Sequence, residues 1–219
     1  MMTHLETELK LLKADTTVMW KLVISQLEKS LHALKTFDKG FSREVIASEK
    51  RVNSMELKID RDCESIFALY NPVAVDLRFV LATLKINNNL ERIGDIAEGI
   101  SRFIISEKEP FDKELLKSTR FEEMFTGANH IVSDVLHAFE KEDTKLARSI
   151  FEKDEILDEI NAEANKNIAE FIQKHPQKTV QALNVLSIIR RLERVGDQSK
   201  NIAEEIIFYM EAKVLKHLE

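Results

Sequence analysis

A pentapeptide that occurs twice constrains the fold of this chain more than any other feature. Residues 91–95 read Glu-Arg-Ile-Gly-Asp, and residues 193–197, which lie 102 positions later, read Glu-Arg-Val-Gly-Asp. The same spacing pairs apolar residues on both sides, such as Leu84 with Leu186 and Ile100 with Ile202. The repeat therefore covers a whole helix, and it predicts a chain built from two similar halves.

The composition and the helix breakers predict an all-α protein. Only 5 Gly and 3 Pro occur among 219 residues, and charged residues reach 32%, a balance typical of long helices with solvated outer faces. Breaks are expected at Asn71-Pro72, Glu109-Pro110 and His175-Pro176, because proline disfavours helix at the residue before it. The expected helices are 5–36, 42–70, 72–106, 112–140, 143–173 and 177–216.

The predicted architecture is two tandem three-helix bundles related by internal duplication. Residues 1–109 form the first bundle and residues 110–219 the second. Two helix starts carry capping side chains: Ser42 is expected to cap the second helix, and Asp143 or Thr144 the fifth.

The repeated motif is costly for a helix, which indicates a function. Residues four apart share a helix face, so the Glu and Asp of each motif repel by roughly 0.2–0.5 kcal/mol. A glycine in a helix interior costs about 1 kcal/mol relative to alanine, but it lets another backbone or a ligand approach closely. Acidic groups beside such a clearance point to cation binding. The alternative is an ordinary solvated face.

The second helix of each half carries a polar stripe that could join the motif. Its members follow i, i+4, i+7 and i+11 spacing, which places them on one side of a helix. They are Glu49, Asn53, Glu56 and Asp60 in the first half, matched by Asp154, Asp158, Asn161 and Asn165 in the second. Oxygen ligands of this kind favour magnesium, calcium, manganese or iron over zinc. The candidate metal ligands are Glu91, Asp95, Glu193, Asp197, Glu49, Asn53, Glu56, Asp60, Asp154 and Asp158, and the sequence leaves open which of them meet.

Several classes of protein are disfavoured. A formal net charge of −6 without a clustered basic stripe argues against nucleic-acid binding. No Glu-x-x-His pattern of di-iron bundles occurs, so His130 and His137 are read as surface residues. Cys63 is the only cysteine, which excludes an internal disulfide and favours a reducing compartment. No signal peptide or membrane-length apolar run is found, which predicts a cytoplasmic protein.

The motif arginines and the aromatic residues are expected to have structural roles. Arg92 and Arg194 are expected to form ion pairs with a neighbouring helix, with an anion as the alternative partner. Large aromatic side chains are expected to anchor the core or an interface, and self-association as a homodimer is expected. These aromatic residues are Trp20, Phe37, Phe41, Phe67, Phe79, Phe121, Phe125 and Phe139.

With these motifs in place, the chain resembles the PhoU family of phosphate-transport accessory proteins. The resemblance rests on the repeated Glu-x-x-x-Asp, on residues 76–78 (Asp-Leu-Arg) after Pro72, and on Val52-Asn53 with Glu56 and Asp60. It implies two three-helix bundles carrying metal clusters of iron, zinc, manganese or magnesium. The two sites can differ in charge, because Asn161 and Asn165 replace Glu56 and Asp60 in the second half.

The resemblance also implies a function, which is binding and not catalysis. The implied protein is cytoplasmic and reaches the inner membrane only through its partners. Those partners are subunits of the phosphate ABC transporter and the phosphate-sensing histidine kinase, both of which it dampens when phosphate is plentiful. Three alternatives stay open: a regulator of a secondary phosphate transporter, a carboxylate-metal phosphohydrolase without an obvious general base, and a metal-independent scaffold whose acids contact a basic partner.

Overall fold

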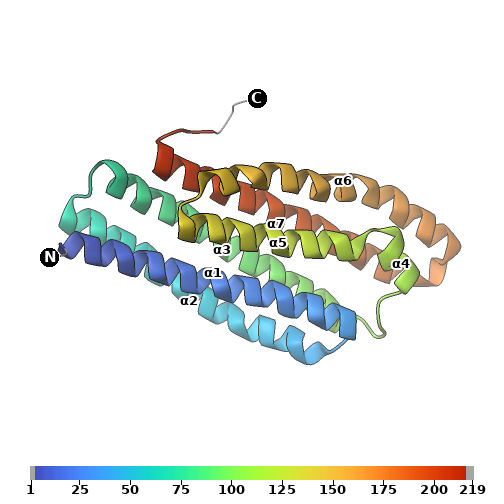
Figure 1. Cartoon of the computed structure of the whole chain (residues 1–219). Coiled ribbons are helices and arrows are strands. Elements are labelled where there is room, and N and C mark those ends of the chain that lie inside the picture. The colour runs from blue at the N-terminus through green and yellow to red at the C-terminus, as the bar shows by residue number, and fades with distance from the viewer. Residues whose placement is uncertain (1–2, 216–219) are drawn as a thin grey trace.

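The computed structural model describes residues 3–215, and the regular structure of this part of the chain is helical without strands, as predicted (Figure 1). Six long helices and two short ones follow one another. They are α1 (His4–Thr36), α2 (Lys39–Tyr70), α3 (Ala74–Ser106), α4 (Lys113–Ser118), α5 (Phe121–Lys141), α6 (Thr144–Lys174), the 3-10 turn η1 (Pro176–Lys178) and α7 (Thr179–Glu211).

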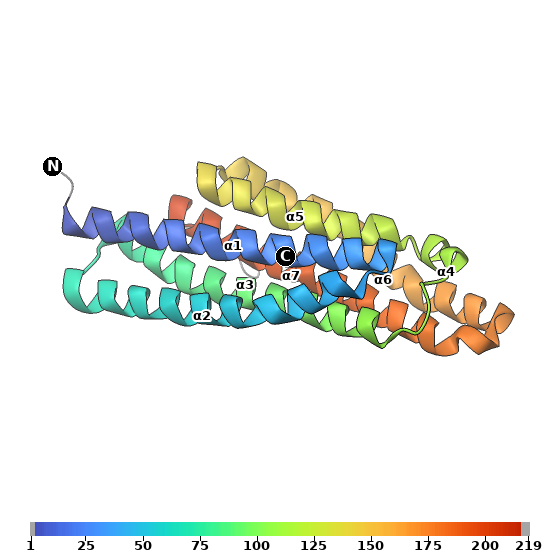
Figure 2. The same cartoon turned by 90° about the horizontal axis from the view of Figure 1, so that it is seen from below.

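The long helices lie side by side along one axis of an elongated molecule (Figure 2). Helices α1, α2 and α3 pack against one another, and so do α5, α6 and α7. The two groups meet mainly where α3 packs along α7. Arg78 near the start of α3 donates a hydrogen bond to the carbonyl of Tyr209 near the end of α7, and Phe103 near the end of α3 contacts Arg191 in the first half of α7, so the two helices run antiparallel. The division at residue 109 stays a prediction.

Local signals place most helix ends correctly. Asn71 ends α2 in the left-handed conformation with φ 46°, directly before Pro72. Asp143 caps α6 by accepting hydrogen bonds from the backbone of Lys145 and Leu146, as expected. The cap predicted at Ser42 is wrong: Asp38 caps α2, and Ser42 lies buried one turn into the helix.

The first helix of the second half is broken, contrary to the single helix predicted over 112–140. Arg120 adopts φ 51° between α4 and α5, where its guanidinium binds Glu123 and Glu159. Leu115 before the break and Phe121 after it are both buried, so the bend lets both sides reach the core. The last helix ends at Glu211, so the helix predicted up to 216 is wrong over residues 212–215, where Ala212 adopts φ 56° directly after the helix; residue 216 itself lies outside the described residues.

The core confirms the role expected of several aromatic residues. Trp20, Phe121, Phe125 and Phe139 are fully buried, whereas Phe37, Phe41, Phe67 and Phe79 are only partly buried. Trp20 donates its ring N–H to the carbonyl of Val132 on α5 at 3.2 Å, which ties the two halves together. Cys63 is buried as well, and burial raises the pKa of its thiol to about 12, with further contributions from nearby carboxylates. No helix within residues 3–215 is long and apolar enough to cross a membrane.

Candidate functional site

The glycine of each motif makes room for a buried carboxylate from the neighbouring helix. A Cβ atom on Gly94 would lie 3.3 Å from Oε2 of Glu49 on α2. A Cβ atom on Gly196 would lie only 1.9 Å from Oδ1 of Asp154 on α6. A close approach therefore occurs in both halves, but a side chain makes it instead of the backbone or ligand expected from the sequence; this side chain belongs to the first residue of each polar stripe.

The first acidic cluster consists of Glu49 on α2 with Glu91, Asp95 and Glu98 on α3. Glu49 is only 5% exposed; its Oε2 accepts a hydrogen bond from Gln26 on α1 at 2.8 Å, whereas its Oε1 is buried without a partner among the described residues. Burial raises the pKa of Glu49 to about 7, and the negative charges of Asp95, Glu98 and Glu91 raise it further. This carboxyl therefore keeps its proton to a higher pH than an exposed glutamate does.

The remaining stripe residues of the first half have different surroundings. Asn87 on α3 donates a hydrogen bond to Oδ1 of Asp60 at 2.8 Å and another to the backbone carbonyl of Glu56 at 2.9 Å, which ties α2 to α3. Burial raises the pKa of the Glu56 carboxyl, and so do Asp60 and Asp95. Asn53 is exposed. The charge of the motif residue Asp95 therefore acts on Glu56, whereas Asp60 forms a hydrogen bond that joins α2 to α3.

The second acidic cluster consists of Asp154 and Asp158 on α6 with Glu193 and Asp197 on α7. It differs from the first by containing a lysine. Nζ of Lys200 forms ion pairs with Asp154, with Asp197 at 3.0 Å and with Asp158 at 3.9 Å. Burial lowers the pKa of Lys200, but its bonds to Asp154 and Asp197 raise it more. The ammonium group therefore stays charged and partly neutralises the cluster.

Asp154 is the most buried carboxylate of the second cluster, with 1% exposure. Burial raises its pKa, while Lys200 lowers it. The pKa of Glu193 is raised by burial and by Asp197, Asp158 and Asp154. Oδ1 of Asp154, like Oε1 of Glu49, is buried without a hydrogen-bond partner among the described residues, so the two deepest acids differ in the ion pair that Asp154 forms with Lys200.

Three residues of the clusters escaped the sequence motifs: Gln26, Glu98 and Lys200. The sequence does contain a signal for Glu98 and Lys200, because the 102-residue spacing of the repeat pairs these two residues. The repeat therefore replaces an acid by a base at the same helical position. Gln26 lies on the first helix of its half, and no motif marks it.

The clusters contain the carboxylates that a cation site needs, but these carboxylates are not positioned around a common point. Among residues 3–215, no group of three or more Asp, Glu, His or Cys side chains is arranged to hold a metal ion. The buried, unpartnered Oε1 of Glu49 fits a cation in the first cluster; Oδ1 of Asp154 is unpartnered too, but Lys200 already supplies a positive charge there. Asp95 is exposed and Glu91 and Glu98 are partly exposed, so their side chains have room to rotate.

The motif arginines do not form the expected ion pairs. Arg92 and Arg194 are exposed, and neither has an ion pair or a hydrogen bond within the described chain. Burial raises the pKa of Glu91, and so do Asp95 and Glu56. The positive charge of Arg92 partly offsets this increase. The guanidinium groups are thus available to other partners.

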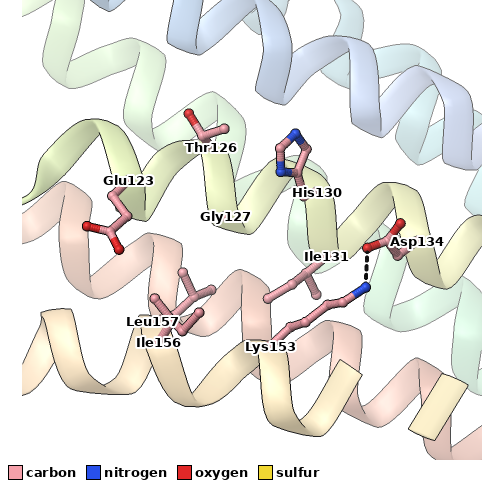
Figure 3. A pocket seen from close by; sticks show the side chains of 9 residues that line it. All are labelled: Glu123, Thr126, Gly127, His130, Ile131, Asp134, Lys153, Ile156 and Leu157. Carbon is pink, nitrogen blue, oxygen red and sulfur yellow. Dashed lines mark hydrogen bonds and ion pairs between the residues drawn. The ribbon is translucent and has the colours of Figure 1, made fainter. Parts of the chain in front are cut away.

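A separate hollow of about 520 Å³ lies between α5 and α6 (Figure 3). Lys153 of α6 binds Asp134 of α5 there at 2.7 Å, and His130 stands one turn before Asp134. No residue of either acidic cluster lines this hollow. His130 therefore does not contribute to the candidate site.

Comparisons with known proteins agree with this geometry. The PhoU domain model matches residues 16–104 and 121–206. The chain is 34% identical to the phosphate-specific transport system accessory protein PhoU homolog 1 of Thermotoga maritima, over 97% of this chain and 91% of that protein. It superimposes on the crystal structure of PhoU from Pseudomonas aeruginosa with a TM-score of 0.89 and 29% identity, covering 94% of this chain and 99% of that one.

A second solved structure gives the same result. The phosphate transport system regulatory protein PhoU from Streptococcus pneumoniae has a TM-score of 0.86 and 26% identity, covering 97% of this chain and 100% of that one. These names describe accessory and regulatory proteins and no enzyme. Two copies of one domain, a shared fold and nearly complete coverage lead to a single conclusion: the chain belongs to the PhoU family.

Proposed function

We propose that this protein is a regulatory accessory protein of phosphate uptake that acts by binding and not by catalysis. The observation that carries the proposal is the match to named phosphate-transport accessory proteins over nearly the full length of both chains. In this proposal it works in the cytoplasm and reaches the membrane through its partners. It restrains the phosphate ABC transporter and the phosphate-sensing histidine kinase when phosphate is plentiful.

Complementation tests this function directly. A bacterial strain that lacks its own PhoU protein is supplied with this chain, and phosphate uptake and a phosphate-starvation reporter are measured in phosphate-rich medium. Restored repression of both supports the proposal. Unchanged uptake and reporter activity, with the protein expressed and folded, would contradict it. Repression in a strain that has only a secondary phosphate transporter would instead assign the chain to that class of transporter.

The proposal extends to a metal ion at the first acidic cluster. Glu49, Glu91 and Asp95 would hold a divalent or trivalent cation such as magnesium, manganese, iron or zinc, which would supply positive charge to the carboxylates. The unpartnered Oε1 of Glu49 supports this assignment. In the second cluster Lys200 already provides a positive charge beside Asp154, so the two halves are expected to differ in metal affinity.

Elemental analysis after metal loading separates the two clusters. The double variant Glu91→Ala/Asp95→Ala is expected to lose the bound metal, whereas its counterpart Glu193→Ala/Asp197→Ala keeps it. Circular dichroism checks that both variants stay helical. Equal loss in both variants would place metal in both halves, and unchanged metal in the first variant would remove these ligands from the proposal. Absence of metal under every loading condition would favour a metal-independent scaffold.

A further inference from the structure

A hollow lined by arginines lies where α3 packs against α7. Its volume is about 340 Å³. Each helix contributes two arginines, and the acids Asp95 and Glu98 line the same space. Four positive groups against two negative ones make this hollow locally basic in a chain whose formal net charge is −6. The four arginines are Arg92, Arg102, Arg191 and Arg194.

Three of these arginines have donors that nothing in the described chain uses. Arg102 is already paired with Glu98 at 2.6 Å. Arg92 and Arg194 form no ion pair or hydrogen bond within residues 3–215, and Arg191 has only a stacking contact there, with its guanidinium 5.4 Å from the ring centre of Phe103. Planar guanidinium groups carry five N–H donors that match the oxygens of a phosphate.

A glycine positions Arg191 in the hollow. A Cβ atom on Gly99 would lie 2.6 Å from Nη1 of Arg191, so the guanidinium occupies the space that a side chain at residue 99 would take. Phe103, one turn further along α3, provides the flat surface beneath the same group. The guanidinium of Arg191 therefore packs against α3 while its donors stay free for a ligand.

The equivalent position in the internal repeat is also hollow, with a volume of about 390 Å³, but its lining is different. The 102-residue spacing relates Gly99 to Asn201 and Arg191 to Asn89. Asn201 donates a hydrogen bond to Asn89 at 3.5 Å, and Lys85 next to this pair binds Glu205 at 3.1 Å. Among its lining residues Arg92 is the one arginine, and the acid Glu205 lines it too. The arginine hollow thus occurs at only one of the two related positions, and the duplication alone does not explain it.

We propose that the arginine hollow binds a small phosphate-type oxyanion, either inorganic phosphate or the phosphate group of a small organic phosphate. Arg92, Arg191 and Arg194 hold the anion, and Arg102 neutralises Glu98 beside it. The volume lies at the lower end of the range for small-molecule sites. The site rests on the arginines alone and depends neither on a metal ion nor on a transporter.

Calorimetric titration of inorganic phosphate into the metal-stripped full chain, in a phosphate-free buffer, tests the site. The wild-type protein is expected to bind with saturation. Arg191→Ala and Arg194→Ala each remove charged hydrogen bonds, so each is expected to weaken binding about 10- to 100-fold. Arg190→Ala is the matched control: it removes the same charge one residue away, but Arg190 bonds Asn165 on α6 and does not line the hollow.

Two further measurements keep the test decisive. Arg194 is exposed and has no ion pair or hydrogen bond within the described chain, so its alanine variant is expected to fold even where Arg191→Ala does not. Titration with ATP separates the sources of phosphate: tighter binding of ATP assigns an organic phosphate, and tighter binding of inorganic phosphate assigns the free anion. In both cases Arg194→Ala must weaken the binding.

Three results would overturn the proposal. The first is no saturable binding of phosphate or ATP up to roughly 10 mM, where a weak single site is still detectable. The second is a loss in Arg190→Ala as large as in Arg194→Ala, which would indicate a general charge effect. The third is binding of an acidic peptide without binding of either small ligand, which would make the hollow a protein contact.

Discussion

At the scale of single residues, an absent side chain decides where the buried carboxylates lie. Gly94 and Gly196 leave the space into which Glu49 and Asp154 extend. Glycine lowers the stability of an isolated helix, but here it prevents a collision with a neighbouring helix. The two positions differ in tightness, since the nearest atoms are 3.2 Å from a Cβ at residue 94 and 1.9 Å from one at residue 196.

Gly196→Ala is therefore expected to lower the free energy of unfolding. The methyl group must displace the 1% exposed Asp154 from its ion pair with Lys200, at an overpacking cost of roughly 1–3 kcal/mol. Gly99→Ala is the control, because its methyl group meets only the far end of the long Arg191 side chain, which can shift, and it should gain up to about 1 kcal/mol of helix propensity. Urea denaturation measures both variants. Equal stability of the two would contradict this account.

Glu49 makes the stability of the metal-free protein depend on pH. Its pKa is about 7 in the folded protein, raised by burial from an ordinary value of 4.5 and further by Asp95, Glu98 and Glu91. The folded state therefore holds this proton more tightly than the unfolded state does. The free energy of unfolding is expected to fall as pH rises from 4.5 to about 7, by at most about 3 kcal/mol.

Denaturation at several pH values measures this effect, and Glu49→Gln should remove most of it. Glu44→Gln on the exposed side of the same helix is the control and should leave the slope unchanged. The prediction would be contradicted if the free energy of unfolding of the wild-type protein rose over this pH interval and Glu49→Gln abolished the rise.

At the scale of helices, the two repeats place acidic side chains at the same contact between two helices, but they differ in charge. Helices α2 and α3 bring together acids without a lysine, whereas α6 and α7 bring acids to Lys200. A buried ion pair adds little stability by itself, but removing one partner leaves an uncompensated charge. Lys200 is therefore expected to stabilise the contact between α6 and α7 at neutral pH.

The variant Lys200→Met should lower the free energy of unfolding by roughly 3 kcal/mol at pH 8, where the lone Asp154 must be charged or must take up a proton. Adding Asp154→Asn should recover part of this loss, because the buried charge is then absent. A double-mutant cycle measured by urea denaturation gives the coupling. Losses that simply add would show that the two groups do not interact.

At the scale of the whole molecule, the antiparallel contact between α3 and α7 joins the two groups of helices. Buried residues from both halves belong to one hydrophobic cluster, including Ile86 and Ile93 on α3 and Ile188 and Val195 on α7. A half of the chain expressed alone would expose this apolar face to water. The protein is therefore expected to be stable only with both halves present.

Residues 1–109 and 110–219, produced separately, should show lower melting temperatures than the full chain or should self-associate. When mixed, they should bind each other and regain the stability of the whole. Circular dichroism and size-exclusion chromatography with light scattering measure this, and the same chromatography tests the homodimer expected for the full chain. Monomeric halves that melt at the temperature of the intact protein would contradict this prediction.

The sequence by itself determined the helices, their approximate ends and the duplication. Apolar spacing, Pro72, Pro176 and the cap at Asp143 act within a few residues, so each is readable locally. The sequence named Glu49 and Asp154 among ten candidate metal ligands. It did not show that these two are the stripe members that lie beside the motif glycines. The metal ligands, the homodimer and the named partners stay predictions.

The tertiary structure alone decided the contacts between helices. The bend at Arg120 depends on packing of both flanking helices, and the ion pair between Lys200 and Asp154 joins residues far apart in the chain. The stacking of Arg191 over Phe103 likewise requires α3 and α7 to meet in one register. Local patterns specify which face of a helix is apolar, but the depth and rotation of packing settle which polar groups are left facing one another.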